Sequence, residues 1–128
     1  MSVHVKPGVQ FSVIAPAGFL ILAAIKRASK DLGLDLTITS GTDGAHSGPT
    51  DPHHLGEAFD IRSHDLAPEI RARVVETVMA GLGWTHFFGF LEAPGTPNEH
   101  FHFQRKQGTT FSVADLLAFD PKGETCQA

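Results

Sequence analysis

The chain of 128 residues has only one cysteine, Cys126, and this scarcity removes several classes of site. A single cysteine cannot form an internal disulfide, so the sequence gives no sign of an oxidising compartment. It also cannot supply the thiolates that most structural zinc sites use. Any metal site in this chain is therefore expected to consist of histidine and carboxylate side chains.

Long apolar runs and basic clusters are missing as well. No run of about 18 apolar residues occurs, so we expect no membrane span. The net charge of −4 and the lack of a lysine or arginine cluster argue against a role in nucleic-acid binding. The first residues lack a basic segment followed by an apolar one, so they are not expected to act as a signal peptide.

Size and composition are typical of a single small domain covering residues 1–128. Hydrophobic residues make up 41% of the chain and charged residues 19%, which is enough for one modest core. Periodicity and the positions of glycine and proline predict helices at 17–32, 68–82 and 112–119, and strands at 34–40, 58–62, 84–91 and 101–105. This order predicts an α+β fold, in which a small antiparallel sheet has helices packed on one side.

Two phrases of the sequence carry candidate chemistry. Residues 53–60 read His-His-Leu-Gly-Glu-Ala-Phe-Asp, and residues 98–103 read Asn-Glu-His-Phe-His-Phe. Together they bring two histidines, an aspartate and a spare carboxylate within reach of one another. Three ligands of N and O type, with a fourth position left to water, are typical of a catalytic zinc site. Gly56, inside the first phrase, predicts a bend or a close approach of the backbone.

Strand alternation predicts which way these side chains point. Phe59 and Ile61 alternate with Asp60, so Asp60 is expected to point away from the face that buries its two neighbours. In the second phrase two phenylalanines alternate with His100 and His102. Both histidines are therefore expected on one face of a strand, with the phenylalanines turned to the core.

The two phrases resemble the signature of the M15 family of zinc peptidases. This family includes D-alanyl-D-alanine carboxypeptidases and dipeptidases and the L-alanyl-D-glutamate endopeptidases of bacteriophage endolysins. It shares its fold with the hedgehog signalling domain, so a hedgehog-like form of the α+β architecture is expected. The resemblance covers residues 34–104. It implies that His53, Asp60 and His102 hold a zinc ion and that Glu99 is the catalytic carboxylate.

The chain departs from the family pattern after the Ser-Gly pair at residues 40–41. The family commonly has an aromatic residue and a substrate-binding arginine there, whereas this chain continues Thr-Asp-Gly-Ala-His. His46 is the candidate replacement for the arginine as a substrate contact, and Asp43 is the other substrate-facing candidate in this stretch. His54, next to a proposed ligand, is interpreted as a loop histidine, because three ligands are already assigned.

The activity implied by the resemblance is zinc-dependent hydrolysis of an amide bond in the peptidoglycan stem peptide. Glu99 would take a proton from water and return it to the leaving amine, and His100 would stabilise the oxyanion or orient Glu99. A regular strand would turn Glu99 away from His100, so this role requires irregular backbone at residues 97–98. Without that irregularity, Glu57 or Asp43 becomes the candidate base.

Which bond is cut depends on whether the chain binds or repels the terminal carboxylate of the substrate. Asp43 would repel a terminal carboxylate, so cleavage between L-alanine and D-glutamate is favoured over removal of terminal D-alanine. A D-alanyl-D-alanine carboxypeptidase remains the alternative, in which Arg62, Arg105 or Lys106 would supply the missing positive charge.

Two further alternatives are not enzymes. One is a virion structural protein stabilised by zinc, and the other is a binding module of the hedgehog type. The carboxylate of Glu99, which is not one of the expected ligands, argues against a purely structural site. Without an export signal, the enzyme is expected to be a phage product. It would stay in the host cytoplasm until a holin-type partner releases it, or travel in the virion among other virion proteins.

Overall fold

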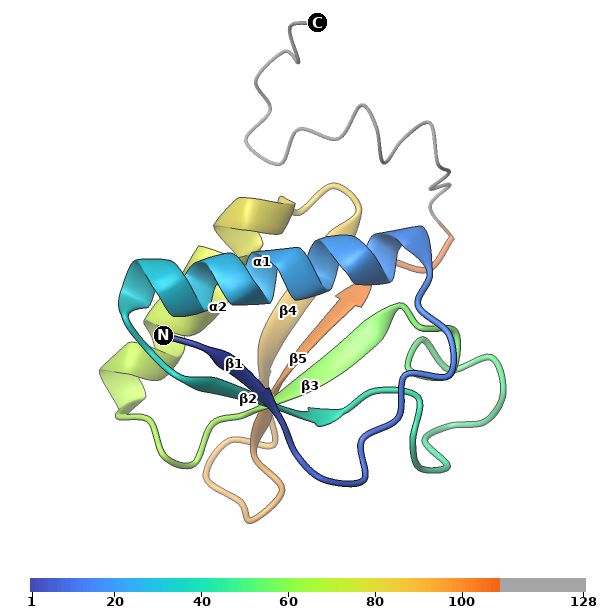
Figure 1. Ribbon diagram of the computed structural model, residues 1–128, viewed down its shortest axis with the longest axis horizontal. Coiled ribbons are helices and arrows are strands. Elements are labelled where there is room, and N and C mark those ends of the chain that lie inside the picture. The colour runs from blue at the N-terminus through green and yellow to red at the C-terminus, as the bar shows by residue number, and fades with distance from the viewer. Residues whose placement is uncertain (109–128) are drawn as a thin grey trace, which may run out of the picture.

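The computed structural model describes residues 1–108, which form a five-stranded sheet with two helices packed on the same face (Figure 1). The elements in chain order are β1 Val3–Val5, α1 Pro16–Leu32, β2 Leu36–Ser40, β3 Ala58–Arg62, α2 Pro68–Leu82, β4 Phe87–Glu92 and β5 His100–Arg105. The predicted α+β class is confirmed. The helix predicted at 112–119 lies outside the described residues.

The sheet is mixed, whereas the sequence predicted an antiparallel one. Its strand order is β1-β2-β3-β5-β4, and β1 pairs with β2 in parallel while every other pair is antiparallel. The strand β1 was missed because only three residues, Val-His-Val, carry the pattern. Its parallel pairing follows from the connection, because α1 carries the chain from β1 to β2.

Most predicted elements are present with small shifts at their ends. The bounds of α2 and β3 are those predicted, whereas β4 begins three residues later than expected and extends to Glu92. Each helix starts with a proline in its first turn, which needs no hydrogen-bonded N–H there. Among the described residues, no helix is long and apolar enough to cross a membrane.

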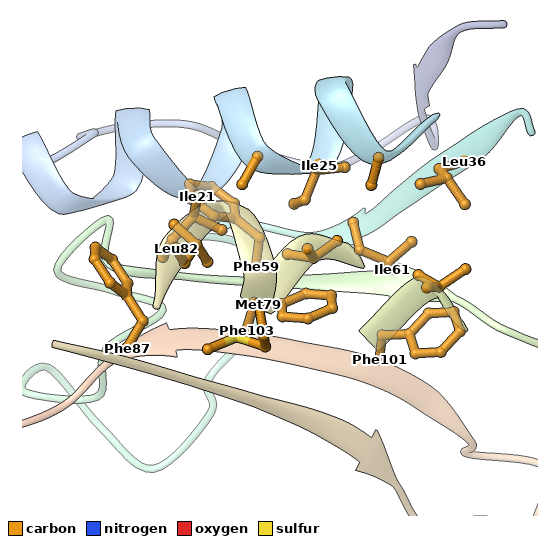
Figure 2. Packing of buried hydrophobic residues seen from close by; sticks show 14 of the residues in the cluster. Ile21, Ile25, Leu36, Phe59, Ile61, Met79, Leu82, Phe87, Phe101 and Phe103 are labelled. Atoms are coloured by element: carbon orange, nitrogen blue, oxygen red, sulfur yellow. The ribbon is translucent and has the colours of Figure 1, made fainter. Parts of the chain in front are cut away.

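The core lies between the helices and one face of the sheet (Figure 2). Phe59 and Ile61 of β3 are fully buried there, as are Phe101 and Phe103 of β5. They pack with buried residues of the helices, including Ile21, Ile25, Val74, Val78 and Met79. Each such side chain contributes about 1.5–3 kcal/mol by leaving water, so this packing fixes the pairing of the two strands firmly.

The opposite face of the sheet carries polar side chains in three cross-strand rows, set by the same alternation. The central row contains Ser40, Asp60, His102 and Phe90. The Arg62 row contains Arg62, His100 and Glu92, and the Gln104 row contains Ala58, Gln104 and Phe88. We call this surface the open face.

Candidate metal centre

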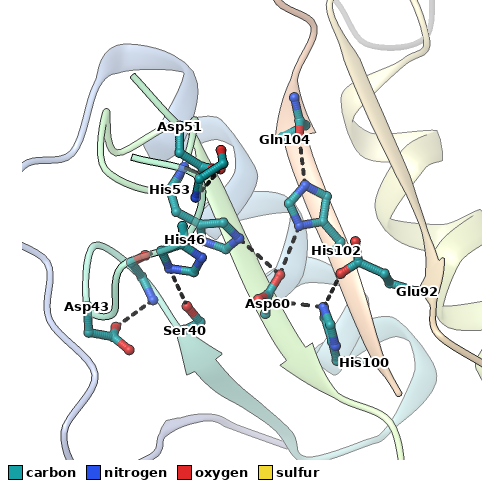
Figure 3. Close-up of polar contacts among 12 residues, drawn as sticks. Ser40, Asp43, His46, Asp51, His53, Asp60, Glu92, His100, His102 and Gln104 are labelled. Carbon is teal, nitrogen blue, oxygen red and sulfur yellow. Dashed lines mark hydrogen bonds and ion pairs between the residues drawn. The ribbon is translucent and has the colours of Figure 1, made fainter. Parts of the chain in front are cut away.

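The side chains of His53 and His102 converge on one carboxylate oxygen of Asp60 above the open face (Figure 3). The Nε2 atom of His53 lies 3.2 Å from Asp60 Oδ1, and the Nδ1 atom of His102 lies 2.9 Å from the same oxygen. All three residues are buried. Their ligand atoms lie within 4.8 Å of one another, so they form a group that could hold a metal ion.

Strand pairing places two members of the group, and a tight turn places the third. Asp60 and His102 are directly opposite each other in the pairing of β3 with β5. Ala58, on the same face as Asp60, has a small side chain and is fully buried. The turn that carries His53 closes with a hydrogen bond from Gly56 N–H to His53 O.

The expected bend at Gly56 is present, together with the expected close approach. Gly56 has φ +71°, and a Cβ atom there would lie 2.3 Å from the carbonyl oxygen of Val13. Its own carbonyl accepts a hydrogen bond from Ala15 N–H, just before α1. Only glycine fits this conformation at this distance, so the segment before α1 fixes the position of the His53 turn.

The second nitrogen of each histidine determines which atom faces Asp60. The Nδ1 atom of His53 lies 3.2 Å from Gly41 O, and the Nε2 atom of His102 lies 2.7 Å from Gln104 Oε1. Both oxygens only accept hydrogen bonds, so these nitrogens carry hydrogens. When the two histidines are neutral, the nitrogens that face Asp60 carry lone pairs, as metal-ligating histidines require, and when they are protonated the same nitrogens donate hydrogen bonds to Asp60.

The electrostatics of the group favour a positive charge between its members. Burial alone would raise the pKa of Asp60, but hydrogen bonds from His102 and His53 outweigh it and hold the pKa well below its usual range. Burial alone would lower the pKa of His102, but the hydrogen bonds to Asp60 and Gln104 raise it. A proton or a metal cation can supply that charge.

His100 lies beside the group, and its partner is a residue that the sequence did not suggest. Its Nε2 atom is 2.5 Å from Glu92 Oε2 and 3.6 Å from Asp60 Oδ2. Its Nδ1 atom is 2.6 Å from Asn98 O. The predicted strand 84–91 stopped one residue before Glu92, which ends β4 directly opposite His100. The strand register, which the sequence does not reveal, was the missing signal.

Glu99 is not brought together with the three candidate ligands. Its carboxylate accepts hydrogen bonds from Ser63 Oγ at 2.7 Å, Gly95 N–H at 3.0 Å and Arg71 Nη1 at 3.1 Å. The side chain is only 3% exposed. The Gly95 N–H and the Ser63 hydroxyl hold the pKa of Glu99 below its usual value against the effect of burial, with help from the charge of Arg71. The carboxylate for which the resemblance implied a catalytic role is therefore bound by neighbouring residues of the fold.

The two substitute carboxylates also have structural partners. Glu57 forms an ion pair with Arg105, with Glu57 Oε2 at 2.7 Å from Arg105 Nη1. Asp43 accepts hydrogen bonds from the backbone N–H groups of Gly41 and Gln10, at 2.8 and 3.1 Å. Asp43 thus holds the turn after β2 against the N-terminal segment.

His46 lies against the candidate ligand His53, with the two rings stacked at 4.0 Å between centroids and 3° between planes. Its Nε2 atom is 3.2 Å from Ser40 Oγ, and its φ of +44° is unusual for a residue with a side chain. His46 and His53 also form a second possible metal group with Asp51. Because both groups contain His53, they overlap at one residue.

His54 makes contacts within its own loop. Its Nδ1 atom lies 2.7 Å from Gly48 O and its Nε2 atom 2.6 Å from Gly44 O. The bonds to Gly44 and then Gly48 raise the pKa of His54, because both carbonyls accept hydrogen. These contacts agree with the interpretation of His54 as a loop histidine.

Comparisons of the chain with models of protein families, with curated proteins and with solved structures found no match. The described residues therefore define an α+β protein with a histidine and aspartate group suited to a metal ion.

Proposed function

We propose that the protein is a zinc-dependent peptidase that hydrolyses an amide bond in the peptidoglycan stem peptide. The observation that carries this proposal is the convergence of His53 Nε2, His102 Nδ1 and Asp60 Oδ1 on the open face. Two imidazole nitrogens and a carboxylate oxygen suit zinc in catalytic sites, and iron(II) in some oxygenases. When bound, zinc would lower the pKa of a water molecule and polarise the substrate carbonyl.

The histidines fit this role because of their outer hydrogen bonds. Gly41 O and Gln104 Oε1 hold the far nitrogens of His53 and His102, which fixes the ring orientations before any cation arrives. The amide of Gln104 is itself oriented, because its Nε2 atom donates to Arg105 O at 3.1 Å. Preorganisation of this kind is expected of a site that binds its metal tightly.

His100 and Glu92 are the residues proposed to move protons. Both nitrogens of His100 face oxygen atoms, Glu92 Oε2 at 2.5 Å and Asn98 O at 2.6 Å, so a proton can pass directly between His100 Nε2 and Glu92 Oε2 at the margin of the group. Glu92 is 45% exposed and can take a proton from water, while His100 can donate one to the leaving amine. In this proposal Glu99 holds the loop before β5 in place, and the Glu92–His100 pair performs the acid and base chemistry.

The choice of substrate rests on the resemblance of residues 53–60 and 98–103 to the zinc peptidase signature. Endopeptidase cleavage between L-alanine and D-glutamate is the preferred reaction, and removal of terminal D-alanine is the alternative. A phage endolysin or a virion-associated enzyme is the matching biological role. The Glu92–His100 pair favours an enzyme over a structural zinc protein, because a structural site has no use for a proton-transfer pair.

Digestion of purified peptidoglycan tests the proposal. Wild-type protein, a chelated sample, His100→Ala and the control His4→Ala would be compared, since His4 lies exposed on β1. We expect new N-terminal D-glutamate, detected by mass spectrometry, from wild-type protein and His4→Ala, about a hundredfold less or lower still from His100→Ala, and none from the chelated sample. Free D-alanine alone would establish the carboxypeptidase alternative. Absence of any cleavage by zinc-loaded wild-type protein would refute the enzyme proposal.

A further inference from the structure

A cavity of about 330 Å³ opens beside the candidate metal centre and is lined by Asp60 of the centre and by the neighbouring His100. The rest of the lining comes from strand ends and from the loop before β5, and consists of Lys6, Thr39, Ser40, Arg62, His64, Pro97, Asn98 and Glu99. The cavity therefore lies next to the place where a scissile amide would sit, on the side of the Arg62 row.

The lining includes two cationic side chains, those of Arg62 and Lys6, and both residues are exposed. Within residues 1–108, neither side chain has a hydrogen bond or an ion pair, unlike Arg71 and Arg105, which pair with Glu99 and Glu57. Arg62 and Lys6 are therefore available to a ligand.

The two carboxylates of the lining, those of Glu99 and Asp60, already have partners and therefore repel a bound anion only weakly. Hydrogen bonds from Ser63, Gly95 and Arg71 engage the Glu99 carboxylate, and His53 and His102 contact Asp60 Oδ1. Asn98 and Thr39 add neutral hydrogen-bonding groups. The cavity thus offers two free cations and polar donors to a small anionic group.

We propose that Arg62 and Lys6 form a subsite for a carboxylate attached to the carbon next to the scissile nitrogen. This inference rests on the proposed function and names the substrate class of the same site. Arg62 follows Asp60 by two residues on the same strand face, a separation of about 6.6 Å. Three bonds join the scissile carbonyl carbon to such a carboxylate, a span of at most about 4 Å, so the guanidinium of Arg62 can reach it.

Two bonds of the stem peptide present this carboxylate. D-Glutamate joined through its side chain keeps a free α-carboxylate next to the nitrogen of the L-alanine bond. Terminal D-alanine carries its own carboxylate in the same relation to the D-alanyl-D-alanine bond. With this subsite, repulsion by Asp43 no longer argues against cleavage of the D-alanyl-D-alanine bond. Binding experiments therefore have to show whether the carboxylate comes from D-glutamate or from terminal D-alanine.

The test uses the products of the two reactions, which are not cleaved further. γ-D-Glutamyl-L-lysine and its α-carboxamide would be titrated into the purified protein by calorimetry, followed by D-alanine and D-alaninamide. We expect the wild-type protein to bind at least one carboxylate about tenfold more tightly than its amide, because Arg62 forms charge-assisted hydrogen bonds only with the former. The compound whose carboxylate form binds more tightly than its amide by the larger factor identifies the residue, D-glutamate or D-alanine, that the subsite recognises.

Variants separate the subsite from direct contact with a metal ion. Arg62→Ala and Lys6→Ala should reduce the carboxylate preference, and Arg62→Lys should keep part of it. Arg73→Ala, which removes an exposed arginine of α2, should leave the preference unchanged. A preference that survives in Arg62→Ala and Lys6→Ala, or a wild-type protein with no preference, would overturn the subsite.

The two proposals fail in different ways. Cleavage of peptidoglycan without any carboxylate preference would reject the subsite and keep the proposed function. Carboxylate binding that depends on Arg62, in a preparation that cleaves no peptidoglycan, would keep the subsite as a binding site and reject the peptidase.

Discussion

His102 lies directly opposite Asp60 in the pairing of β3 with β5, and the Nδ1 atom of His102 is 2.9 Å from Asp60 Oδ1. The residues that flank them, Phe59 and Phe103, form the neighbouring pair and are fully buried on the helix side. The same register therefore closes the core and aligns two candidate ligands. This pairing would couple the stability of the fold to the affinity for any metal ion that the group holds.

Metal content should depend on each of the three converging residues. His53→Ala, Asp60→Ala and His102→Ala should each lose zinc, and the wild-type protein should lose thermal stability when a chelator removes the metal. Inductively coupled plasma mass spectrometry measures the content, and His4→Ala serves as the control. Full zinc occupancy in one of the three variants would remove that residue from the ligand set.

Loss of the proton-transfer pair should reduce turnover without loss of metal. His100→Ala and Glu92→Gln should retain zinc and lower kcat by about a hundredfold or more, because both groups are proposed to move protons. Peptidoglycan turnover and metal content would be measured on the same samples. Unchanged turnover in both variants would return the base role to Glu99 or another carboxylate.

Glu99→Gln should lower stability at neutral pH, because Ser63, Gly95 and Arg71 bind the ionised carboxylate. The pKa of Glu99 is lower in the folded chain than its usual value. Its stabilising contribution is therefore complete above the unfolded pKa of about 4.3 and is lost as the pH falls through the folded pKa.

Denaturant unfolding at several pH values checks this expectation. The stability gap between wild-type protein and Glu99→Gln should be largest near neutral pH and should shrink in acid. Glu76→Gln, on the exposed side of α2, should show no such gap. A Glu99→Gln variant with wild-type stability and zinc content but strongly reduced turnover would favour the catalytic role that the sequence predicted.

Gly56→Ala should destabilise the fold and weaken metal binding together. The new Cβ atom would meet Val13 O at 2.3 Å in a backbone conformation with φ +71°, so the His53 turn would have to shift. We expect a cost of about 1–3 kcal/mol from the conformation, with a further cost from the clash. Gly33→Ala has nearly the same φ, +66°, and open space around it, so it measures the conformational cost alone. Equal losses in the two variants would show that the close approach contributes nothing.

The sheet face on which a side chain lies was predicted well from the sequence, because it depends only on alternation within one strand. Asp60, His100 and His102 lie on the predicted face because side chains in a strand alternate, whatever surrounds them. The bend at Gly56 was predictable for a similar local reason, since a positive φ favours glycine.

Features that could not be predicted from the sequence depend on contacts between segments that are distant in the chain. Nothing near Glu99 indicates that Arg71, 28 residues earlier, pairs with its carboxylate. The predicted strand 84–91 left Glu92 out because proline and glycine follow it closely, and only the pairing of β4 with β5 places it opposite His100. Spacing in the chain therefore predicted the grouping of His53, Asp60 and His102 better than it predicted the contacts of Glu99 and Glu92.

The alternation along β5 also limits how this protein can be altered by insertion or deletion. Adding one residue between Phe101 and His102 would turn over the part of the strand on one side of the insertion, so that a histidine would face the helices and a phenylalanine the open face. The core and the donor atoms would then both be damaged in a single event. The loop at residues 93–97 has no alternation of this kind, and its side chains do not enter the core, although Gly95 N–H is bound to Glu99. Changes of length there can alter what surrounds the site while the strands keep their positions, so diversification by insertion is confined to the rim.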